Sequence, residues 1–133
     1  MSANTDAIAA THDAFNRGDI EAVLEGFDPG MEWKVPETLP YGGQFHGPEE
    51  IGGFFQGLTE YFSELNVQVN ELIDAGEYVT DIATIRGKAK EGGGDVEAAA
   101  VFIWTMRDGK PVAFREYSDT AAIVQGLRAG ATA

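Results

Sequence analysis

The sequence predicts an α+β fold: three helices of the N-terminal half pack on the concave face of a cone-shaped, strongly curved mixed or antiparallel β-sheet, and a short helix follows at the C-terminus. Three observations carry this prediction. Apolar residues recur at helical spacing in the first half of the chain, they alternate with polar residues in the second half, and glycine-containing turns separate the alternating segments. Helices followed by a run of strands are typical of an α+β fold.

Three helices are expected before the main run of strands. The first begins at an N-cap at Asn4 and continues until Gly18 ends it. Asp19 then caps a second, short helix that continues to residue 27 and forms a hairpin with the first. The Gly-Pro-Glu-Glu sequence at 47–50 is typical of a helix start and opens the third helix. The expected buried face of that helix comprises Ile51, Phe54, Phe55, Leu58 and Phe62.

Two features of these helices bear on function. His12 lies on the apolar face of the first helix, where we expect a core or boundary residue rather than a ligand-binding one. Glycines inside the third helix each cost up to ~1 kcal/mol relative to alanine. They indicate either close backbone packing or a helix that shifts to admit a ligand, and they are Gly52, Gly53 and Gly57.

One strand is expected between the second and third helices. Residues 31–36 alternate in polarity, and Pro36 ends the strand. The following loop, residues 37–46, is rich in glycine and proline but also carries Leu, Tyr, Phe and His. Such a composition suits either the rim of a pocket or a loop that packs its aromatic side chains on the core.

An antiparallel meander and a last helix complete the chain. Residues 96–106 are almost continuously apolar, which is expected of a central strand covered on both faces. Asp119 caps the last helix, and Gly130 ends it. No repeat, linker or second domain interrupts the pattern, so residues 1–133 are expected to form one domain. The strands of the meander are residues 65–70, 78–90, 96–106 and 110–118.

The composition excludes several classes of function. Twenty-two acidic residues against nine basic ones give a formal charge of −13, which disfavours nucleic acid and anionic membrane surfaces as partners. The absence of cysteine excludes disulfides and thiolate chemistry. No apolar stretch is long enough to cross a bilayer, and the first ten residues do not resemble a signal peptide. A cytoplasmic protein is expected.

The candidate chemistry centres on Glu116, an acid at an apolar position of the last strand. Period-two spacing places it on one sheet face with Phe114 and Ser118, and a cavity at this face would raise its pKa and allow proton transfer. The alternative is that Glu116 pairs with Arg115 or another cation at a sheet edge. The side chains expected to converge with Glu116 at the open end of the cone are Trp33, Tyr41, Phe54, Phe102 and Trp104.

Other chemistries lack their signatures. The two histidines are isolated, so no metal site is predicted. The glycines at 92–94 join two strands and precede no helix, so no phosphate-binding or dinucleotide-binding loop is predicted, and no nucleophile elbow surrounds either Ser63 or Ser118. Acid/base chemistry without a cofactor remains. In it Asp81, His46 and Tyr41 are the weaker partners of Glu116.

Several segments, in this order, resemble one known family. They are residues 14–19, 32–36, 45–51 and 104–110, continued by 114–119. Across nearly the whole chain the sequence is similar to the nuclear-transport-factor-2-like superfamily, and within it to SnoaL-like, ketosteroid-isomerase-related proteins. This resemblance implies the cone-shaped fold, and it implies a homodimer formed through an outer sheet face that bears Val101 and Ile103.

The same resemblance implies that two known activities are missing. The ketosteroid-isomerase general base falls at Val35, and the isomerase oxyanion tyrosine falls at Thr11. Relatives that hydrolyse limonene epoxide need an arginine and an aspartate, which fall at Ala83 and Ile85. They also need a water-holding tyrosine and asparagine, which fall at Trp33 and Val35. Neither activity is expected of this chain.

One site of the family is retained. The polyketide-cyclase acid/base falls at Glu116, with Glu in place of Asp. A histidine that many relatives carry on the neighbouring strand is Phe102 here, so that the resemblance supports a cavity-facing Glu116 but supplies no partner for it.

Two hypotheses follow. In the first, the chain is a lyase, cyclase or isomerase in which Glu116 moves a proton on a small, mostly apolar carbonyl compound, while Tyr41 or His46 donates a hydrogen bond. In the second, it is a non-catalytic ligand-binding or accessory protein with the same pocket, whose ligand is a small apolar or aromatic molecule. The ligand-binding residues expected in either case are Trp33, Val35, Phe54, Leu58, Ala83, Ile85, Phe102 and Trp104.

Overall fold

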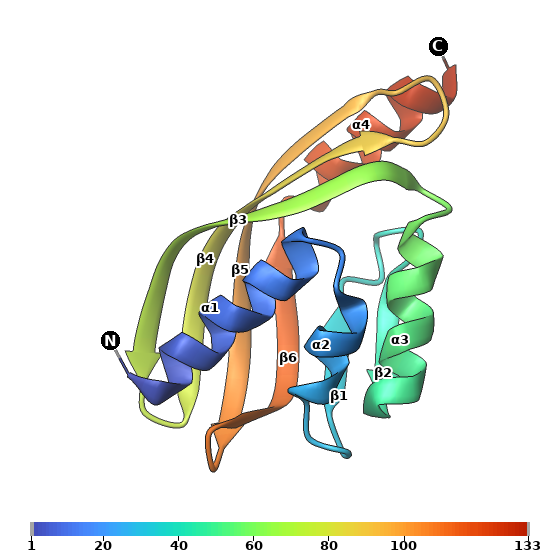
Figure 1. Ribbon diagram of the computed structural model, residues 1–133. Helices are drawn as coiled ribbons and strands as arrows, with labels where there is room; N and C mark the ends of the chain where they lie inside the picture. The colour runs from blue at the N-terminus through green and yellow to red at the C-terminus, as the bar shows by residue number, and fades with distance from the viewer. Residues whose placement is uncertain (1, 133) are drawn as a thin grey trace.

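The computed structural model describes residues 2–132 and contains four helices and one six-stranded sheet. Figure 1 shows α1, α2 and α3 on one side of the sheet, with α4 at the far end of the long strands β4 and β5. The elements in chain order are α1 (Ala3–Asn16), α2 (Ile20–Glu25), β1 (Glu32–Val35), β2 (Gly43–His46), α3 (Gly47–Leu58), β3 (Phe62–Ala75), β4 (Tyr78–Ala89), β5 (Asp95–Arg107), β6 (Lys110–Ser118) and α4 (Thr120–Thr132).

The sheet has the order β2-β1-β6-β5-β4-β3 and is mixed, because β1 pairs with β6 in parallel while the other neighbours are antiparallel. The α1 helix packs on β3 and β4, and α4 packs on β5 and β4. The predicted α+β class, the helices on the concave face and the C-terminal helix are therefore confirmed.

Local chemistry explains where the first helices begin. The hydroxyl of Ser2 accepts a hydrogen bond from the backbone N–H of Thr5 (3.1 Å), and the Thr5 hydroxyl accepts one from the Ser2 backbone N–H (2.9 Å). This reciprocal capping makes Ser2 the N-cap, and the prediction of Asn4 was wrong by two residues. Asp19 caps α2 as predicted, through a 3.1 Å bond from the Ala22 backbone N–H to its Oδ1.

Several element boundaries differ from the sequence prediction, and α4 continues past Gly130, which was expected to end it, to Thr132. The expected loop ends in strand β2, which pairs antiparallel with β1 at the edge of the sheet. The third helix ends at Leu58, and Phe62 is the first residue of β3 rather than the last buried residue of the helix. A buried aromatic residue fits either a helical or a strand period, so the sequence pattern does not decide its element.

Burial of the side chains alternates along β5, where even-numbered residues such as Phe102 and Trp104 are buried in the core. Odd-numbered residues such as Val101 and Ile103 are only partly buried and lie on the side of the sheet away from α1. The prediction that this strand is covered on both faces was therefore wrong for the isolated chain. Its apolar outer face gave the sequence the appearance of a fully buried strand.

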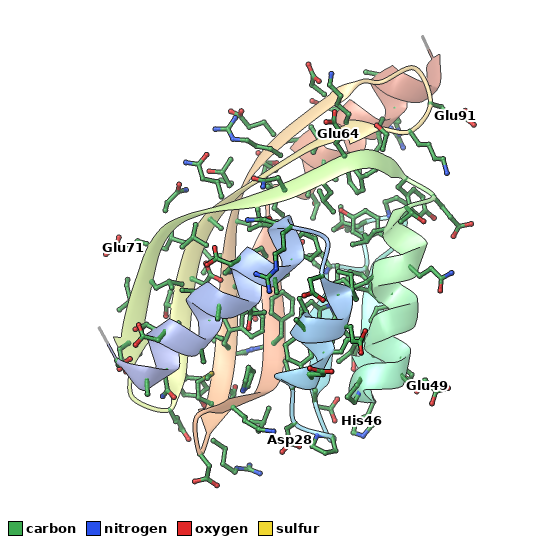
Figure 2. All side chains as sticks on the ribbon, in the orientation of Figure 1. Asp28, His46, Glu49, Glu64, Glu71 and Glu91 are labelled. Carbon is green, nitrogen blue, oxygen red and sulfur yellow. The ribbon has the colours of Figure 1, made fainter. Side chains whose placement is uncertain are left out.

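The surface carries the acidic charge. Glu49, Glu64, Glu71 and Glu91 are exposed, and Figure 2 places them at the periphery of the molecule. Within residues 2–132, the helices do not combine the length and the apolar character that a bilayer-spanning segment needs.

The α3 glycines fall into two kinds. A Cβ atom built on Gly52 would lie 3.2 Å from Cδ1 of Leu24, which indicates close packing between α3 and α2. A Cβ built on Gly53 or Gly57 would meet nothing within 4 Å. Packing therefore explains the first glycine and not the other two, which lower the intrinsic stability of α3.

We predict that Gly53→Ala and Gly57→Ala each raise the free energy of unfolding by about 0.4–1 kcal/mol, because alanine restricts the unfolded chain and favours the helix. Chemical denaturation measures this. Gly126→Ala in α4 is the matched control and should destabilise, because its Cβ would lie 2.5 Å from the Asp95 carbonyl oxygen and 2.6 Å from Cγ2 of Val96. Unchanged or lower stability in both α3 variants would contradict the prediction.

Candidate active site

A cavity of about 80 Å³ lies between the N-terminal helices and the sheet. Side chains from α1, α2, α3, the loop after β1 and all the strands except β2 line it, and most of them are aromatic or aliphatic. Eight of the side chains that the sequence singled out lie around this cavity: Trp33, Tyr41, Phe54, Leu58, Ile85, Phe102, Trp104 and Glu116.

Three of the predicted site residues lie elsewhere. Val35 and Ala83 are buried in the core and do not line the cavity. His46 lies at the start of α3 with its side chain 62% exposed, and Figure 2 shows it pointing outward. Its Nδ1 is 2.9 Å from Oε1 of Glu32, and its backbone N–H donates to Glu50. The expectation that His46 meets the ligand is corrected, because the unforeseen strand β2 holds it at the surface.

Glu116 projects from β6 toward the cavity. It is partly buried, and Oγ of Ser118 donates a 2.8 Å hydrogen bond to its Oε2. Burial raises the pKa of Glu116 to about 7, against the smaller, opposing effect of the Ser118 hydrogen bond. Arg115, the alternative partner, is exposed and forms no ion pair with Glu116 among the described residues. The carboxyl group is therefore able to exchange a proton near neutral pH.

Tyr41 brings a hydroxyl group to the same cavity from the loop after β1. Its ring packs against Phe54, with 6.2 Å between the ring centroids. Burial, and secondarily the negative charge of Glu116, raise the pKa of Tyr41 well above its usual value. The phenol therefore keeps its proton at neutral pH and remains a hydrogen-bond donor.

Sequence reasoning underrated a second polar group, His12 on α1. His12 is buried, lines the cavity, and its Nε2 forms a hydrogen bond with Oδ2 of Asp81 on β4. Asp81 has no exposed surface, and its Oδ2 also accepts a 3.0 Å hydrogen bond from Nε1 of Trp104. A signal was present in the sequence, because Asp81 shares the inward face of its strand with Ala83 and buried acids require a partner.

The strand register places the two acids of the site in one row. Asp81 on β4 pairs with Phe102 on β5, and Phe102 pairs with Glu116 on β6. Two strand spacings separate the acids, which corresponds to about 10 Å between their backbones. The ring of His12 lies over this row, with 6.1 Å between its centroid and that of Phe102.

One further donor at the cavity is unused. Trp33 stacks on Phe114, with ring centroids 3.7 Å apart and planes inclined by 12°. Its Nε1 is buried and has no hydrogen-bond partner among the described residues. A buried donor without a partner is costly, so an acceptor atom of a ligand that reached it would gain binding energy. In residues 2–132 the structure contains no group of three or more side chains arranged to hold a metal ion.

Comparison with known proteins agrees with this geometry. The model of the SnoaL-like domain family matches residues 8–114, which is most of the chain. The chain belongs to this family. The fold and the family that the sequence segments indicated are thereby confirmed, and the match extends from within α1 to the middle of β6.

Solved structures of similar proteins cover almost the whole chain. An NTF2-like protein of unknown function from Burkholderia pseudomallei is 28% identical, with a TM-score of 0.90 over 96% of this chain and 98% of that one. TerC, co-crystallised with polyporic acid, is 29% identical, with a TM-score of 0.88 over 96% and 99%. A proposed SnoaL-like polyketide cyclase from Jannaschia sp. CCS1, 21% identical over 96% and 92%, shares the fold with a TM-score of 0.82. The sequence matches none of the curated proteins significantly.

The raised pKa of Glu116 predicts a pH-dependent stability. Folding favours the protonated carboxyl, so this stabilisation is complete below about pH 4.5 and is lost as the pH rises through about 7. Glu116→Gln resembles the protonated state, so its stability relative to wild type should increase by up to about 3 kcal/mol between pH 4.5 and pH 8. Chemical denaturation at several pH values measures the difference.

The exposed variant Glu71→Gln on β3 is the control, because it removes one negative charge far from the cavity (Figure 2). A carboxylate-detected titration of wild type against Glu116→Gln should give the Glu116 pKa directly. A value near the ordinary 4.5 would mean that the carboxyl is solvated, and it would overturn this description of the site.

Proposed function

We propose that this protein is a cofactor-independent enzyme of the lyase, cyclase or isomerase kind, in which Glu116 transfers a proton on a small, mostly apolar carbonyl compound. The observation that carries the proposal is a carboxyl group with a pKa of about 7 at an aromatic cavity. A general acid/base works best when its pKa is near the working pH. The small volume of the cavity, about 80 Å³, restricts the enclosed part of a ligand to about one ring.

Two donors at the cavity suit the oxygen of such a compound. The Tyr41 phenol stays protonated, and the indole N–H of Trp33 is unused. Either would stabilise negative charge that develops on a carbonyl oxygen when a neighbouring C–H bond is broken. The apolar surfaces of Phe54 and Phe102 provide contact area for the rest of the molecule. The co-crystallisation of the relative TerC with polyporic acid supports a small organic ligand.

The decisive experiment uses 2-indanone as a substrate probe and 2-naphthol as an analogue of its enol. NMR in D₂O measures the exchange of the protons next to the carbonyl of 2-indanone, and quenching of tryptophan fluorescence measures 2-naphthol affinity. We predict that wild type accelerates the exchange and that Glu116→Gln lowers the rate by about 10²-fold or more. The affinity for 2-naphthol should change by less than about threefold, because the amide keeps the shape and polarity of the carboxyl group.

The same two measurements distinguish the proposed enzyme from a binding protein without catalytic activity. A purely ligand-binding protein would bind 2-naphthol, lose binding in Trp33→Ala or Trp104→Ala, and show no exchange in wild type. Unchanged exchange in Glu116→Gln would refute the proposed role of the carboxyl group. The matched control for the loss of a negative charge is again Glu71→Gln.

We further propose that the protein is a homodimer formed through the outer face of the sheet. The side chains on this face include Ile82, Val101 and Ile103, which are partly buried, and Tyr78 and Tyr117, which are 38% and 57% exposed. In register they form adjacent rows, because Ile82 pairs with Val101 and Val101 pairs with Tyr117. Large apolar patches on a soluble protein mark interaction surfaces.

Ile103→Glu tests this interface. Sedimentation velocity should give a dimer for wild type at micromolar concentration and a monomer for the variant, because the new carboxylate would be desolvated at the interface. Asn66→Glu adds the same charge at an exposed position and should leave the dimer intact. A wild type that sediments only as a monomer would refute the proposal.

A further inference from the structure

The buried pair of His12 and Asp81 has the geometry of a positioned base. Trp104 only donates, so Oδ2 of Asp81 acts as an acceptor toward it. The same oxygen is bonded to Nε2 of His12, and we assign Nε2 as the donor because a carboxylate only accepts. The imidazole is thereby fixed in orientation, with the proton of its neutral form on Nε2. No hydrogen bond to the described residues engages the other ring nitrogen, Nδ1, and the ring lines the cavity.

The arrangement of His12 and Asp81 costs more free energy than an apolar pair that only filled the core. The carboxyl of Asp81 is removed from water completely, and its Oδ1 has no partner among the described residues. Removing a carboxylate from water costs several kcal/mol, which its hydrogen bonds only partly offset. An apolar pair at the same positions would pack α1 on the sheet without this cost, so packing alone does not account for the pair.

We propose that His12, positioned by Asp81 and Trp104, is the second proton-transfer residue of the cavity, taking a proton from carbon while Glu116 gives one to the carbonyl oxygen. The inference rests on the proposed function, because it uses Glu116 as the acid. It makes His12 a catalytic residue, whereas Asp81 is a positioning residue that acts through the imidazole.

The proton transfers balance. The neutral Nδ1 of His12 accepts the proton from the carbon next to the carbonyl, and the C–H electron pair forms the C=C bond of an enol. The π pair of the carbonyl forms the O–H bond with the proton of Glu116, which leaves a carboxylate and an imidazolium. In the reverse direction the imidazolium protonates carbon and the carboxylate recovers its proton, so that both residues are regenerated without any other reactant.

The row across the sheet indicates the class of substrate. Glu116 and Asp81 are separated by Phe102 alone, and His12 extends from the Asp81 side over the Phe102 ring. A planar ketone that stacked on Phe102 would present its oxygen to Glu116 and an adjacent C–H group to His12. The substrate class is therefore a cyclic or aryl ketone with an enolisable carbon, in which the two reacting atoms lie within one ring.

Few charged groups surround His12. Asp81 faces it from β4 and Glu116 shares its cavity from β6, while the Tyr41 phenol is the titratable group contributed by the loop. The α1 neighbour Thr11 donates its hydroxyl to the Ala7 carbonyl and carries no charge. The side chains that α2, α3 and β5 contribute to the cavity are apolar apart from the indole N–H of Trp104, which is bound to Asp81.

The pH profile separates this inference from the proposed function. If His12 is the base, Glu116 must be protonated, so kcat/KM for 2-indanone exchange falls as the pH rises through about 7. A rate that rises with pH in His12→Gln as well as in wild type would make Glu116 the base. That outcome overturns the role of His12 and leaves the proposed function intact.

Variants give a second separation. His12→Gln should lower the exchange rate about 10²-fold with little change in 2-naphthol affinity, while His46→Gln, the other histidine, should leave the rate unchanged. Full exchange activity in His12→Gln together with an inactive Glu116→Gln would refute the inference alone. Full activity in Glu116→Gln would refute the proposed function as well.

A spectroscopic test needs no catalytic activity. The chain has only two histidines, so ¹⁵N-detected NMR with His46→Gln as an assignment control resolves His12. Neutral His12 should have its proton on Nε2 and a bare Nδ1. In Asp81→Asn, the amide oxygen can replace Oδ2 as the acceptor of both bonds, so the proton of neutral His12 should stay on Nε2, while loss of the negative charge that stabilises an imidazolium should lower the exchange rate. A wild-type His12 with its proton on Nδ1 would overturn the inference, whether or not the Asn variant folds.

Discussion

The position of α1 over the sheet depends on the hydrogen bonds that Asp81 accepts from His12 and Trp104. The bond between His12 and Asp81 joins α1 to β4 across 69 residues of sequence, and the bond from Trp104 joins β5 to the same carboxyl group. All three side chains are buried. A carboxyl without exposed surface is tolerated only when its bonds are kept, so any shift of α1 that broke them would leave an unpaired buried acid. The constraint holds the imidazole above Phe102 and thus fixes one wall of the cavity.

The remaining walls follow from packing around Trp33. Its ring is stacked on Phe114 and meets Trp104 edge-on, with centroids 5.8 Å apart, while Phe55 closes from α3 at 5.4 Å. Such contacts leave little room for water, and among the described residues only Ser118 forms a side-chain hydrogen bond with the Glu116 carboxyl, so burial raises the pKa of this group. The aromatic core therefore does more than stabilise the fold, because it supplies the low-dielectric surroundings that make an ordinary glutamate exchange protons near neutral pH.

The sequence was sufficient for those features that local pattern determines. The helices and most strands follow from periodicity, and Glu116 stood out because an acid occupied an inward strand position. The features that the sequence did not predict depend on contacts between residues that are far apart in the chain. The partner of Asp81 lies on another element, so His12 appeared to be an isolated core residue. Strand β2 is short and begins with glycine, and only its pairing with β1 reveals it and carries His46 to the surface. The outer face of β5 is apolar enough to resemble a second buried face.

Family membership limits the chemistry of this chain less than its individual side chains do, because one fold can hold many sites. The isomerase positions hold Val35 and Thr11, and neither can transfer a proton from carbon. The two groups that we propose for proton transfer lie instead on β6 and on the next residue of α1, His12, whose side chain reaches β4. Neighbouring residues of a helix differ in direction by about 100°. Thr11 and His12 both line the cavity, but the Thr11 hydroxyl is bonded within α1, whereas the His12 imidazole is bonded to the sheet. The proposed pair thus combines a glutamate at a position that the family resemblance also indicates with a histidine whose place depends on the register between α1 and the sheet.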